Sequence, residues 1–309
     1  MNIQVLDSWL REHLKTTTTP QKLGEIMSLK SASFERIEKL GNDYLYDIEI
    51  TTNRVDMMSV AGIAREASVA LSSEGIEAEY IEKSIPSYKA NNTAFPIKII
   101  SDSKLCSRVS AAILEVEIGK SPQIIKDRLE ATDIRSLNNV VDVTNYVMRE
   151  LGHPMHAFDA DKITDQFKIR EAKKGETITT LDKKEYVLQG GEIVAEDANG
   201  EIIDLLGIMG LLNSSVTEET KRVMLFIDNN NSKKIRDASM MLNIRTDAAI
   251  LNEKDVDPEL GIKALNRGIQ LLTEIANGKL IGDIFDEHNQ KEVHKPISVT
   301  FQKINDVIN

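Results

Sequence analysis

Apolar residues in the first 85 positions repeat at helical spacing in some stretches and in strict alternation in another. Thr19 followed by Pro20 is typical of a helix start, and the apolar residues after this pair follow at mostly helical spacing. Residues 44–50 alternate apolar and polar side chains, which indicates a strand. Ser59 precedes a further helical repeat and suits the N-cap position. These patterns predict a small N-terminal α+β domain over residues 1–85.

A short helix is expected before Thr19. Its apolar positions follow one another at roughly helical spacing: Val5, Trp9, Leu10 and Leu14. His13 would lie on this helix beside the charged Glu12, which favours a surface position for the imidazole.

Beyond a polar linker at residues 86–95, the pattern changes to short strands separated by turns. The stretches typical of strands are 96–100, 110–117, 167–170, 176–181, 186–188, 193–195 and 202–205. Ser121–Pro122 and Asp257–Pro258 each open a helix, because a capping side chain precedes a proline that suits the first helical position. Residues 96–290 are therefore predicted to form a sheet-rich α+β domain.

Residues 136–159 interleave polar and apolar side chains. The polar members are Asn138, Asn139, Thr144, Asn145, His153 and His156, and apolar anchors lie between them at Val140, Val141, Val143, Val147, Leu151 and Phe158. Because buried polar atoms need partners, such a run is the expected lining of a small polar pocket on a rigid frame. The alternative is a helix whose polar residues face water.

The 309-residue chain is long enough for two domains, and its 41% hydrophobic and 28% charged residues are typical of a globular protein. It contains no apolar run of the roughly 18 residues that a membrane span needs, and its N-terminus lacks the pattern of a signal peptide. The single cysteine, Cys106, cannot form an internal disulfide and is interpreted as a structural thiol. We therefore expect a cytoplasmic protein with no membrane partner. The net charge of −11 is unfavourable for binding nucleic acid, because phosphate contacts need a basic surface.

The run at 136–159 closely resembles the editing domain of the β subunit of bacterial phenylalanyl-tRNA synthetase. Other segments are similar to the same family in its order and at its spacing: 47–56, 59–66, 207–210, 216–220, 244–248 and 256–260. The first of these contains Asn53-Arg54-Val55-Asp56, where the family has Asn-Arg-Pro-Asp. Residues 291–309 resemble the opening strand and helix of a further domain, as the family has at this point.

The resemblance implies the N-terminal part of a β subunit in an α2β2 enzyme that ligates phenylalanine to its tRNA. This part alone is not expected to aminoacylate. ATP and Mg²⁺ are expected for the holoenzyme, with no cofactor or metal in this chain, and the expected partners are the α subunit and tRNA. Longer members carry a tRNA-binding oligonucleotide-fold insertion, whereas residues 33–50 here run almost directly across its junction. We therefore expect this chain to bind tRNA weakly.

In the family this domain hydrolyses tyrosine mistakenly attached to the phenylalanine tRNA, because a hydrophobic synthetic pocket rejects an added hydroxyl only moderately. The resemblance places Thr144, Asn145 and His156 around the ester as catalytic groups. It places Gly207 and Gly210 in a turn that lets the ring approach. Thr246 and Ala248 stand where small residues keep the amino-acid pocket open in the family. A histidine could act as a general base, whereas the resemblance favours a positioned water with the protein supplying geometry. The plainer alternatives are a hydrogen-bonded core histidine and ordinary turn glycines.

The sequence departs from the family around this pocket. Phe226 stands where the family usually has the glutamate that receives the tyrosine hydroxyl, and a phenyl ring cannot accept that hydrogen bond. Asp228 lies two residues further on and would point to the same face of a strand, so any compensation is displaced. We expect the Phe226 ring to fill or narrow the pocket between Gly210 and Ala248. Phe226 and Asp228 are both predicted to be substrate-binding residues.

Three functions remain open at this point. The first is the N-terminal part of a phenylalanyl-tRNA synthetase β subunit whose editing of Tyr-tRNA is weakened or lost. The second is an active editing hydrolase with a rearranged pocket. The third is a non-enzymatic binding or scaffold protein derived from the β subunit.

Overall fold

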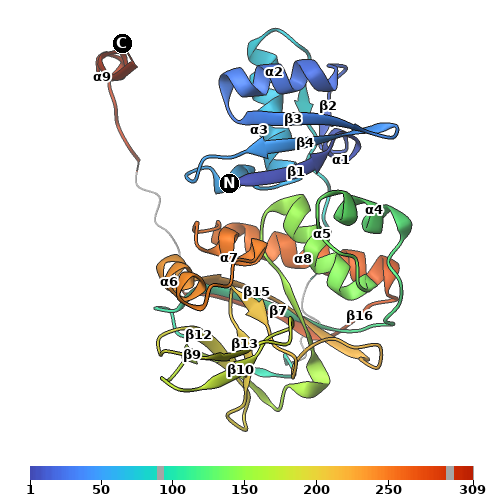
Figure 1. The fold of residues 1–309 in the computed structure, drawn as a ribbon, viewed down its shortest axis with the longest axis vertical. Helices are drawn as coiled ribbons and strands as arrows, with labels where there is room; N and C mark the ends of the chain where they lie inside the picture. Colours follow the sequence, from blue (N-terminus) through green and yellow to red (C-terminus); the bar gives the residue numbers. More distant parts are fainter. Residues whose placement is uncertain (89–93, 290–295, 309) are drawn as a thin grey trace.

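Two regions of α+β structure follow each other along the chain (Figure 1). The computed structural model describes residues 1–88, 94–289 and 296–308. The first of the two regions is here called the N-terminal region. It contains an antiparallel sheet in the order β1 (Asn2–Leu6), β4 (Asp43–Glu49) and β3 (Ser33–Leu40), and a two-stranded pair of β2 (Leu14–Lys15) and β5 (Glu79–Tyr80). Its helices are α1 (Asp7–Arg11), α2 (Pro20–Lys30), η1 (Val55–Met57) and α3 (Val60–Ser73). The predicted α+β class is confirmed, while the boundaries assigned from the sequence stay predictions.

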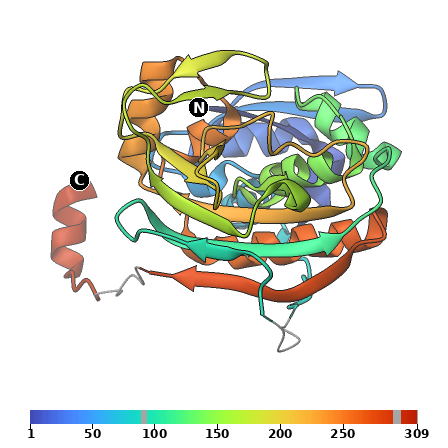
Figure 2. The same ribbon diagram turned by 90° about the horizontal axis from the view of Figure 1, so that it is seen from below.

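The second region contains two sheets and a set of helices. One sheet is antiparallel, in the order β16 (Lys279–His288), β7 (Cys106–Glu115), β15 (Arg222–Asn230) and β8 (His156–Asp159), and Figure 2 shows its three long strands side by side. The other has the order β14 (Met209–Gly210), β13 (Ile202–Leu205), β12 (Ile193–Glu196), β9 (Gln166–Glu171) and β6 (Lys98–Ile100), in which β6 pairs with β9 in parallel. The remaining elements are the pair β10 (Thr177–Thr179) and β11 (Glu185–Val187), and the helices α4 (Gln123–Ala131), α5 (Asn139–Leu151), η2 (Ala160–Lys162), α6 (Ser232–Leu242), α7 (Asp247–Asn252), α8 (Pro258–Ile275) and α9 (Phe301–Ile308).

The four-stranded sheet is the middle layer of the second region. Along β15, Leu225 and Ile227 belong to the core that contains the helices α5 and α8, whereas Met224 and Phe226 belong to the core that contains the five-stranded sheet. This alternation follows from the period of two in a strand, and it explains why β15 is buried along nearly its whole length. Phe226 therefore lies between the two sheets.

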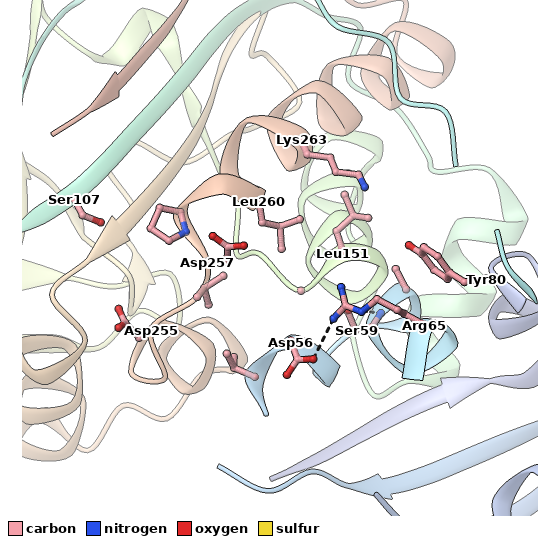
Figure 3. A pocket seen from close by; sticks show the side chains of 16 residues that line it. Asp56, Ser59, Arg65, Tyr80, Ser107, Leu151, Asp255, Asp257, Leu260 and Lys263 are labelled. Atoms are coloured by element: carbon pink, nitrogen blue, oxygen red, sulfur yellow. Dashed lines mark hydrogen bonds and ion pairs between the residues drawn. The ribbon is translucent and has the colours of Figure 1, made fainter. Parts of the chain in front are cut away.

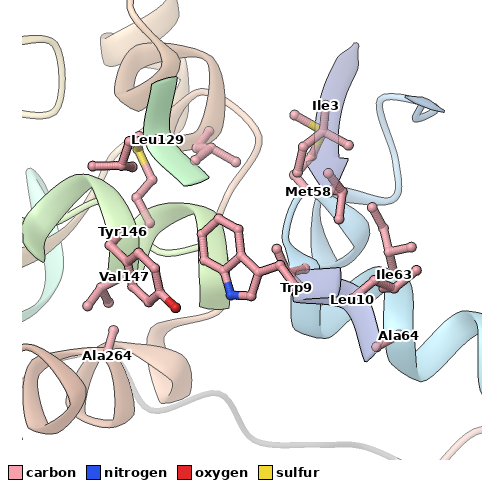
Figure 4. Packing of buried hydrophobic residues seen from close by; sticks show 14 of the residues in the cluster. Ile3, Trp9, Leu10, Met58, Ile63, Ala64, Leu129, Tyr146, Val147 and Ala264 are labelled. Atoms are coloured by element: carbon pink, nitrogen blue, oxygen red, sulfur yellow. The ribbon is translucent and has the colours of Figure 1, made fainter. Parts of the chain in front are cut away.

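The N-terminal region shares one hydrophobic core with α4, α5 and α8. Figure 4 shows Trp9 reaching from the N-terminal region to Tyr146 on α5. The two rings stack with their centroids 4.5 Å apart, and the Arg128 guanidinium carbon lies 5.2 Å from the centre of the Trp9 ring. Arg128 also donates to the Tyr146 hydroxyl over 2.6 Å and to the Glu12 carboxylate. Aromatic stacking and a cation–π contact thus join the two regions.

A buried carboxylate reinforces this junction. Glu150 on α5 accepts hydrogen bonds from Arg267 at 2.7 and 3.1 Å and from Lys83 at 3.2 Å, and His13 Nε2 lies 3.5 Å from its Oε1. Burial alone would raise the pKa of Glu150, but the adjacent His13 ring and the Arg267 guanidinium hold it at about 2. The prediction that His13 lies on the surface is wrong, because the second region covers its side chain.

The predicted helix starts at Thr19–Pro20, Ser59 and Asp257–Pro258 are confirmed, and each cap side chain accepts a hydrogen bond from the first turn. The single helix expected from Val5 to Leu14 is wrong. Val5 lies in β1, which pairs with β4, so the helix covers only Asp7–Arg11 and Leu14 lies in β2.

Two further predictions differ from the structure, and a third lies partly outside the described residues. At Ser121–Pro122 the helix does form, from Gln123 on, but Ser121 donates to Asp142 on α5 instead of capping. Residues 296–300 form no strand. A strand needs a neighbouring strand for its backbone hydrogen bonds, and these residues, like all described residues of the following helix α9, are exposed. The linker at 86–95 lies partly outside the described residues.

We expect Trp9→Ala to lower the free energy of unfolding by about 3–5 kcal/mol, because it removes a buried aromatic ring from the shared core. Urea denaturation followed by circular dichroism measures this change. Leu29→Ala is the matched control, since Leu29 on α2 is 78% exposed, and it should change stability by less than about 0.5 kcal/mol. Equal effects of the two substitutions would contradict a shared core.

Candidate functional site

The run at 136–159 folds as a helix, a tight loop and a strand. Asn138 caps α5 by accepting from the amides of Val140 and Val141, and Gly152 ends the helix with φ 90°. The alternative in which the polar residues face water is wrong, because several of them are buried with hydrogen-bond partners. Asn139 donates to the carbonyls of Glu117 and Ile275 and accepts from Gly119. Most polar groups of this run thus fix the frame, and its end, from Pro154 to His156, lines a cavity.

This cavity, here called the small cavity, has a volume of about 70 Å³ and lies between β15, the turn from β13 to β14, the start of β8 and helix α7. Its lining residues are Pro154, Met155, His156, Asp204, Leu205, Gly207, Ile208, Met209, Gly210, Phe226, Asp228, Ala248 and Asn252. Six residues of the predicted site are therefore brought together: His156, Gly207, Gly210, Phe226, Asp228 and Ala248. Four different stretches of the chain contribute them.

Three residues of the predicted site do not line the small cavity. Thr144 and Asn145 lie on α5, and the Thr144 hydroxyl donates to the Val141 carbonyl over 2.7 Å within its own helix. Thr246 lies beside the cavity as the N-cap of α7, where it donates to the Ile208 carbonyl over 2.6 Å and thereby holds the turn. The catalytic and binding roles assigned to these residues stay predictions.

The two glycines of the turn are needed for close approaches. A Cβ at Gly210 would come within 2.5 Å of the His156 ring, and a Cβ at Gly207 would come within 2.7 Å of Asn230 Nδ2. Gly207 also has φ +69°, a conformation that disfavours other residues. The interpretation of Gly207 as an ordinary turn glycine is therefore compatible with its place in the lining of the cavity.

His156 is held by packing. Its ring meets the Phe158 ring edge-on, with centroids 4.4 Å apart. Burial lowers the pKa of His156 to about 4, so the ring is neutral at pH 7. A base of that pKa is weak at neutral pH, whereas a neutral imidazole can hold a water through either nitrogen. Whether His156 positions a water or acts as a base therefore stays a prediction.

Phe226 is 1% exposed and faces the small cavity within an aromatic cluster. Its ring lies 4.6 Å from that of Phe167 and 5.9 Å from that of Phe158, measured between centroids. Asp228 lies two residues along the same strand and lines the same cavity. Phe226 thus lines the pocket, and its predicted role in narrowing the amino-acid end stays a prediction.

Asp204 on β13 is a lining residue that the sequence analysis missed. An aspartate in an alternating strand gives no local sign of burial, yet this side chain is 4% exposed. Burial, with the charge of Asp228 added to it, raises the pKa of Asp204 well above its ordinary value. Burial also raises the pKa of Asp228, to about 6, although a hydrogen bond from Asn230 opposes the rise. The small cavity therefore contains two carboxyl groups that disfavour ionisation.

A larger cavity lies elsewhere, between the N-terminal region and the second region (Figure 3). Its volume is about 730 Å³, and several of its charged side chains already have partners. Arg65 binds Asp56 over 3.1 Å, and Lys263 binds Glu82. No residue of the predicted site lines it, so we place the candidate site at the small cavity.

Two other kinds of feature are missing from the part of the chain that the structure describes. No group of three or more histidine, cysteine, aspartate or glutamate side chains is arranged to hold a metal ion. None of its helices has the length and apolar character needed to cross a bilayer.

The Cys106 thiol is buried and donates to the Arg108 carbonyl, in agreement with a structural role.

Comparison with known proteins gives one consistent family. The family model described as "B3/4 domain" matches residues 105–277, which is more than half of the chain. The β subunit of phenylalanine–tRNA ligase from Fusobacterium nucleatum subsp. nucleatum is 35% identical over 268 residues, covering 86% of this chain and 33% of that protein. The same subunit from Dehalococcoides mccartyi strain CBDB1 is 37% identical over 276 residues, covering 88% of this chain and 33% of that protein. The chain thus spans about a third of the length of these curated relatives.

One solved structure, an N-terminal fragment of the phenylalanyl-tRNA synthetase β subunit from Pyrococcus horikoshii, is 16% identical. It covers 100% of this chain and 84% of that fragment, with a TM-score of 0.45. At this score the superposition adds nothing to the assignment made from the sequence relatives.

We expect Asp228→Asn to stabilise the protein at neutral pH and to have little effect near pH 4. The folded-state pKa of Asp228 is raised to about 6, so its contribution to stability is complete below the unfolded pKa and is lost as the pH rises through 6. Relative to wild type, the variant should gain up to about 3 kcal/mol between pH 4 and pH 7.5. Urea denaturation at several pH values measures this gain.

The groups that face Asp228 across the cavity are Asp204 and the neutral His156. Asp237→Asn, on the exposed side of α6, is the matched control and should leave the pH profile of stability unchanged. Parallel profiles for Asp228→Asn and wild type would show that the carboxyl of Asp228 is not held in its neutral form by burial.

Proposed function

The chain belongs to the B3/4 domain family and is homologous to the N-terminal region of phenylalanine–tRNA ligase β subunits, and from this we propose that it acts as that part of such a subunit. In this role it works with an α subunit, which uses ATP and Mg²⁺ to ligate phenylalanine to tRNA. The proposal is supported by identities of 35% and 37% over most of the chain. Because the chain spans a third of those relatives, ligation itself is assigned to the complete α2β2 enzyme.

Within that role, we propose that hydrolysis of tyrosyl-tRNA at the small cavity is weakened or lost. The observation that carries this is the cavity volume of about 70 Å³, since pockets for small-molecule ligands commonly measure roughly 300–1,000 Å³. A tyrosyl ring needs more room than this, and the Phe226 side chain takes up part of the cavity wall. Phe226 also supplies no acceptor for a phenol, and an unpaired buried phenol costs about 1–3 kcal/mol.

An active hydrolase with a rearranged pocket is the second candidate. It is favoured by Asp204 and Asp228, which place carboxyl oxygens in the cavity although Phe226 supplies none. In that case His156 and the turn at Gly207 and Gly210 would position the ester and a water. This candidate requires a tyrosyl ester to be cleaved and the cleavage to depend on His156 and Asp228.

The third candidate, a binding or scaffold protein, is favoured by the net charge of −11 alone. That charge also leads us to propose that tRNA reaches this chain mainly through other parts of the enzyme, because an acidic surface repels phosphates. Sequencing the gene beyond the codon of Asn309 decides between the first and third candidates. A frame that continues into the remaining two thirds of a β subunit supports the first.

Incubation of the chain with the phenylalanine tRNA that carries tyrosine (Tyr-tRNA) tests the proposed loss of editing. We expect release of tyrosine at no more than the uncatalysed rate, measured by acid precipitation of labelled Tyr-tRNA. Rapid deacylation that falls sharply in both His156→Ala and Asp228→Ala would establish the rearranged hydrolase instead. Fast release that is unchanged in both variants would contradict each assignment of this site.

We expect Phe226→Glu to destabilise the fold and to improve binding of a tyrosyl ester relative to a phenylalanyl ester. Loss of the buried ring should cost about 1.5–3 kcal/mol, and the new carboxylate adds a desolvation cost. The measurements are urea denaturation and equilibrium binding of the non-hydrolysable 3′-amide analogues of tyrosyl- and phenylalanyl-adenosine.

Phe226→Leu is the matched control, because it opens space without adding an acceptor. It should change the tyrosyl-to-phenylalanyl binding ratio much less than Phe226→Glu does. If both variants give the wild-type ratio, position 226 does not face the amino-acid end of the pocket.

A further inference from the structure

The small cavity is lined by a residue with a buried carboxyl oxygen that lacks a hydrogen-bond partner among the described residues. Oδ1 of Asp204 is buried and has no hydrogen-bond partner among the described residues. Asp204 is 4% exposed and lines the cavity. Native structures rarely leave a buried carboxyl oxygen without a partner, because the loss of hydration is not compensated. The group that would complement this oxygen is a donor that enters the cavity.

A second carboxyl group lines the same space. Asp228 accepts a hydrogen bond from Asn230 Nδ2 over 2.6 Å, while Oδ1 of Asn230 is itself buried and without a partner among the described residues. Asn230 lies next to the turn of the cavity, since its Nδ2 would be 2.7 Å from a Cβ at Gly207. Acceptors therefore outnumber donors on this side of the cavity.

The cavity has no basic counterpart to these carboxyl groups. Its lining residues include no lysine or arginine, and His156 is neutral at pH 7. A bound cation would favour the ionised forms of these two carboxyl groups, which burial disfavours, and a neutral donor would do so less. A ligand that carries both a positive charge and N–H donors matches the lining best, and a protonated amine has both properties.

The walls limit the size of such a ligand. Phe226, Leu205, Ile208 and Met155 supply apolar surface around the carboxyl groups. The volume of about 70 Å³ is well below the roughly 300–1,000 Å³ of common small-molecule pockets. An ammonium group with one or two methylenes therefore suits this space better than a ligand with an aromatic ring.

We propose that the small cavity binds a small protonated primary amine, with Asp204 and Asp228 as its acceptors and with apolar walls around its short alkyl part. The inference rests on the proposed function, because it assigns a new ligand to a pocket that has lost the room for a tyrosyl ring. It makes Asp204 a binding residue and turns Asp228 from a displaced phenol acceptor into a cation acceptor.

Isothermal titration of the complete chain with ethylammonium chloride at pH 7.5 and constant ionic strength tests the proposal. We expect saturable binding to one site. Asp204→Asn and Asp228→Asn should each weaken it by about tenfold, the cost of losing one charge-assisted hydrogen bond. Asp237→Asn on the exposed face of α6 is the matched control and should bind like wild type.

Two further salts separate the amine from other cations. Tetramethylammonium carries the charge without N–H donors and should not bind, and potassium chloride should not compete with ethylammonium. Binding of either salt as strongly as ethylammonium would overturn the proposal, as would saturable binding that neither aspartate substitution weakens. Absence of any saturable binding would overturn it as well.

A measurement on the wild-type chain avoids dependence on the variants. Carboxyl ¹³C NMR should show the titration midpoints of Asp204 and Asp228 moving to lower pH when ethylammonium is present, because the cation stabilises the ionised forms. Unchanged midpoints would overturn the proposal even if the variants failed to fold. The Tyr-tRNA assay reports separately on the proposed function, so an active tyrosyl hydrolase and an absent amine site are distinguishable results.

Discussion

Burial of β15 on both faces is the constraint on which the second region depends. One face of this strand packs on the layer of α5 and α8, and the other packs on the five-stranded sheet. Every side chain from Val223 to Asn230 is buried as a result. A polar residue on this strand must therefore find a partner inside the protein or shift its pKa. The small cavity lies where this demand is not fully met, at Asp228.

The N-terminal region contributes to the site through α5. Trp9 stacks on Tyr146, and Arg267 and Lys83 bind Glu150, so this helix is held at two positions near its C-terminal end. Its C-terminal glycine, Gly152, lies against Ser59, since a Cβ there would be 3.2 Å from the Ser59 Cβ. The loop that follows holds His153 between the Pro154 carbonyl and Asn229, and then delivers His156 to the cavity. His156 itself packs edge-on against the Phe158 ring and close to Gly210.

Local chemistry made part of this fold predictable. Cap residues such as Thr19 and Asp257 act within one helical turn, so they can be read from neighbouring residues. The burial of His13 and the long strand β16 depend on partners far away in the chain, and no local pattern contains them. Most of the site came from the resemblance to a known family and not from periodicity. Asp204 lay outside that resemblance and has the appearance of a solvent-facing strand residue, so only the approach of the five-stranded sheet to β15 reveals it.

Phe226 and the two aspartates act on stability in opposite directions. The phenyl ring fills space between two sheets and stabilises the fold by about 1.5–3 kcal/mol, while each buried carboxyl that must ionise reduces that gain. Neither aspartate is needed for packing, because an apolar residue of similar size would fill the same place without the cost of desolvation. Carboxyl groups kept at such a cost, in a cavity without a basic residue, are accounted for most simply if a ligand completes them.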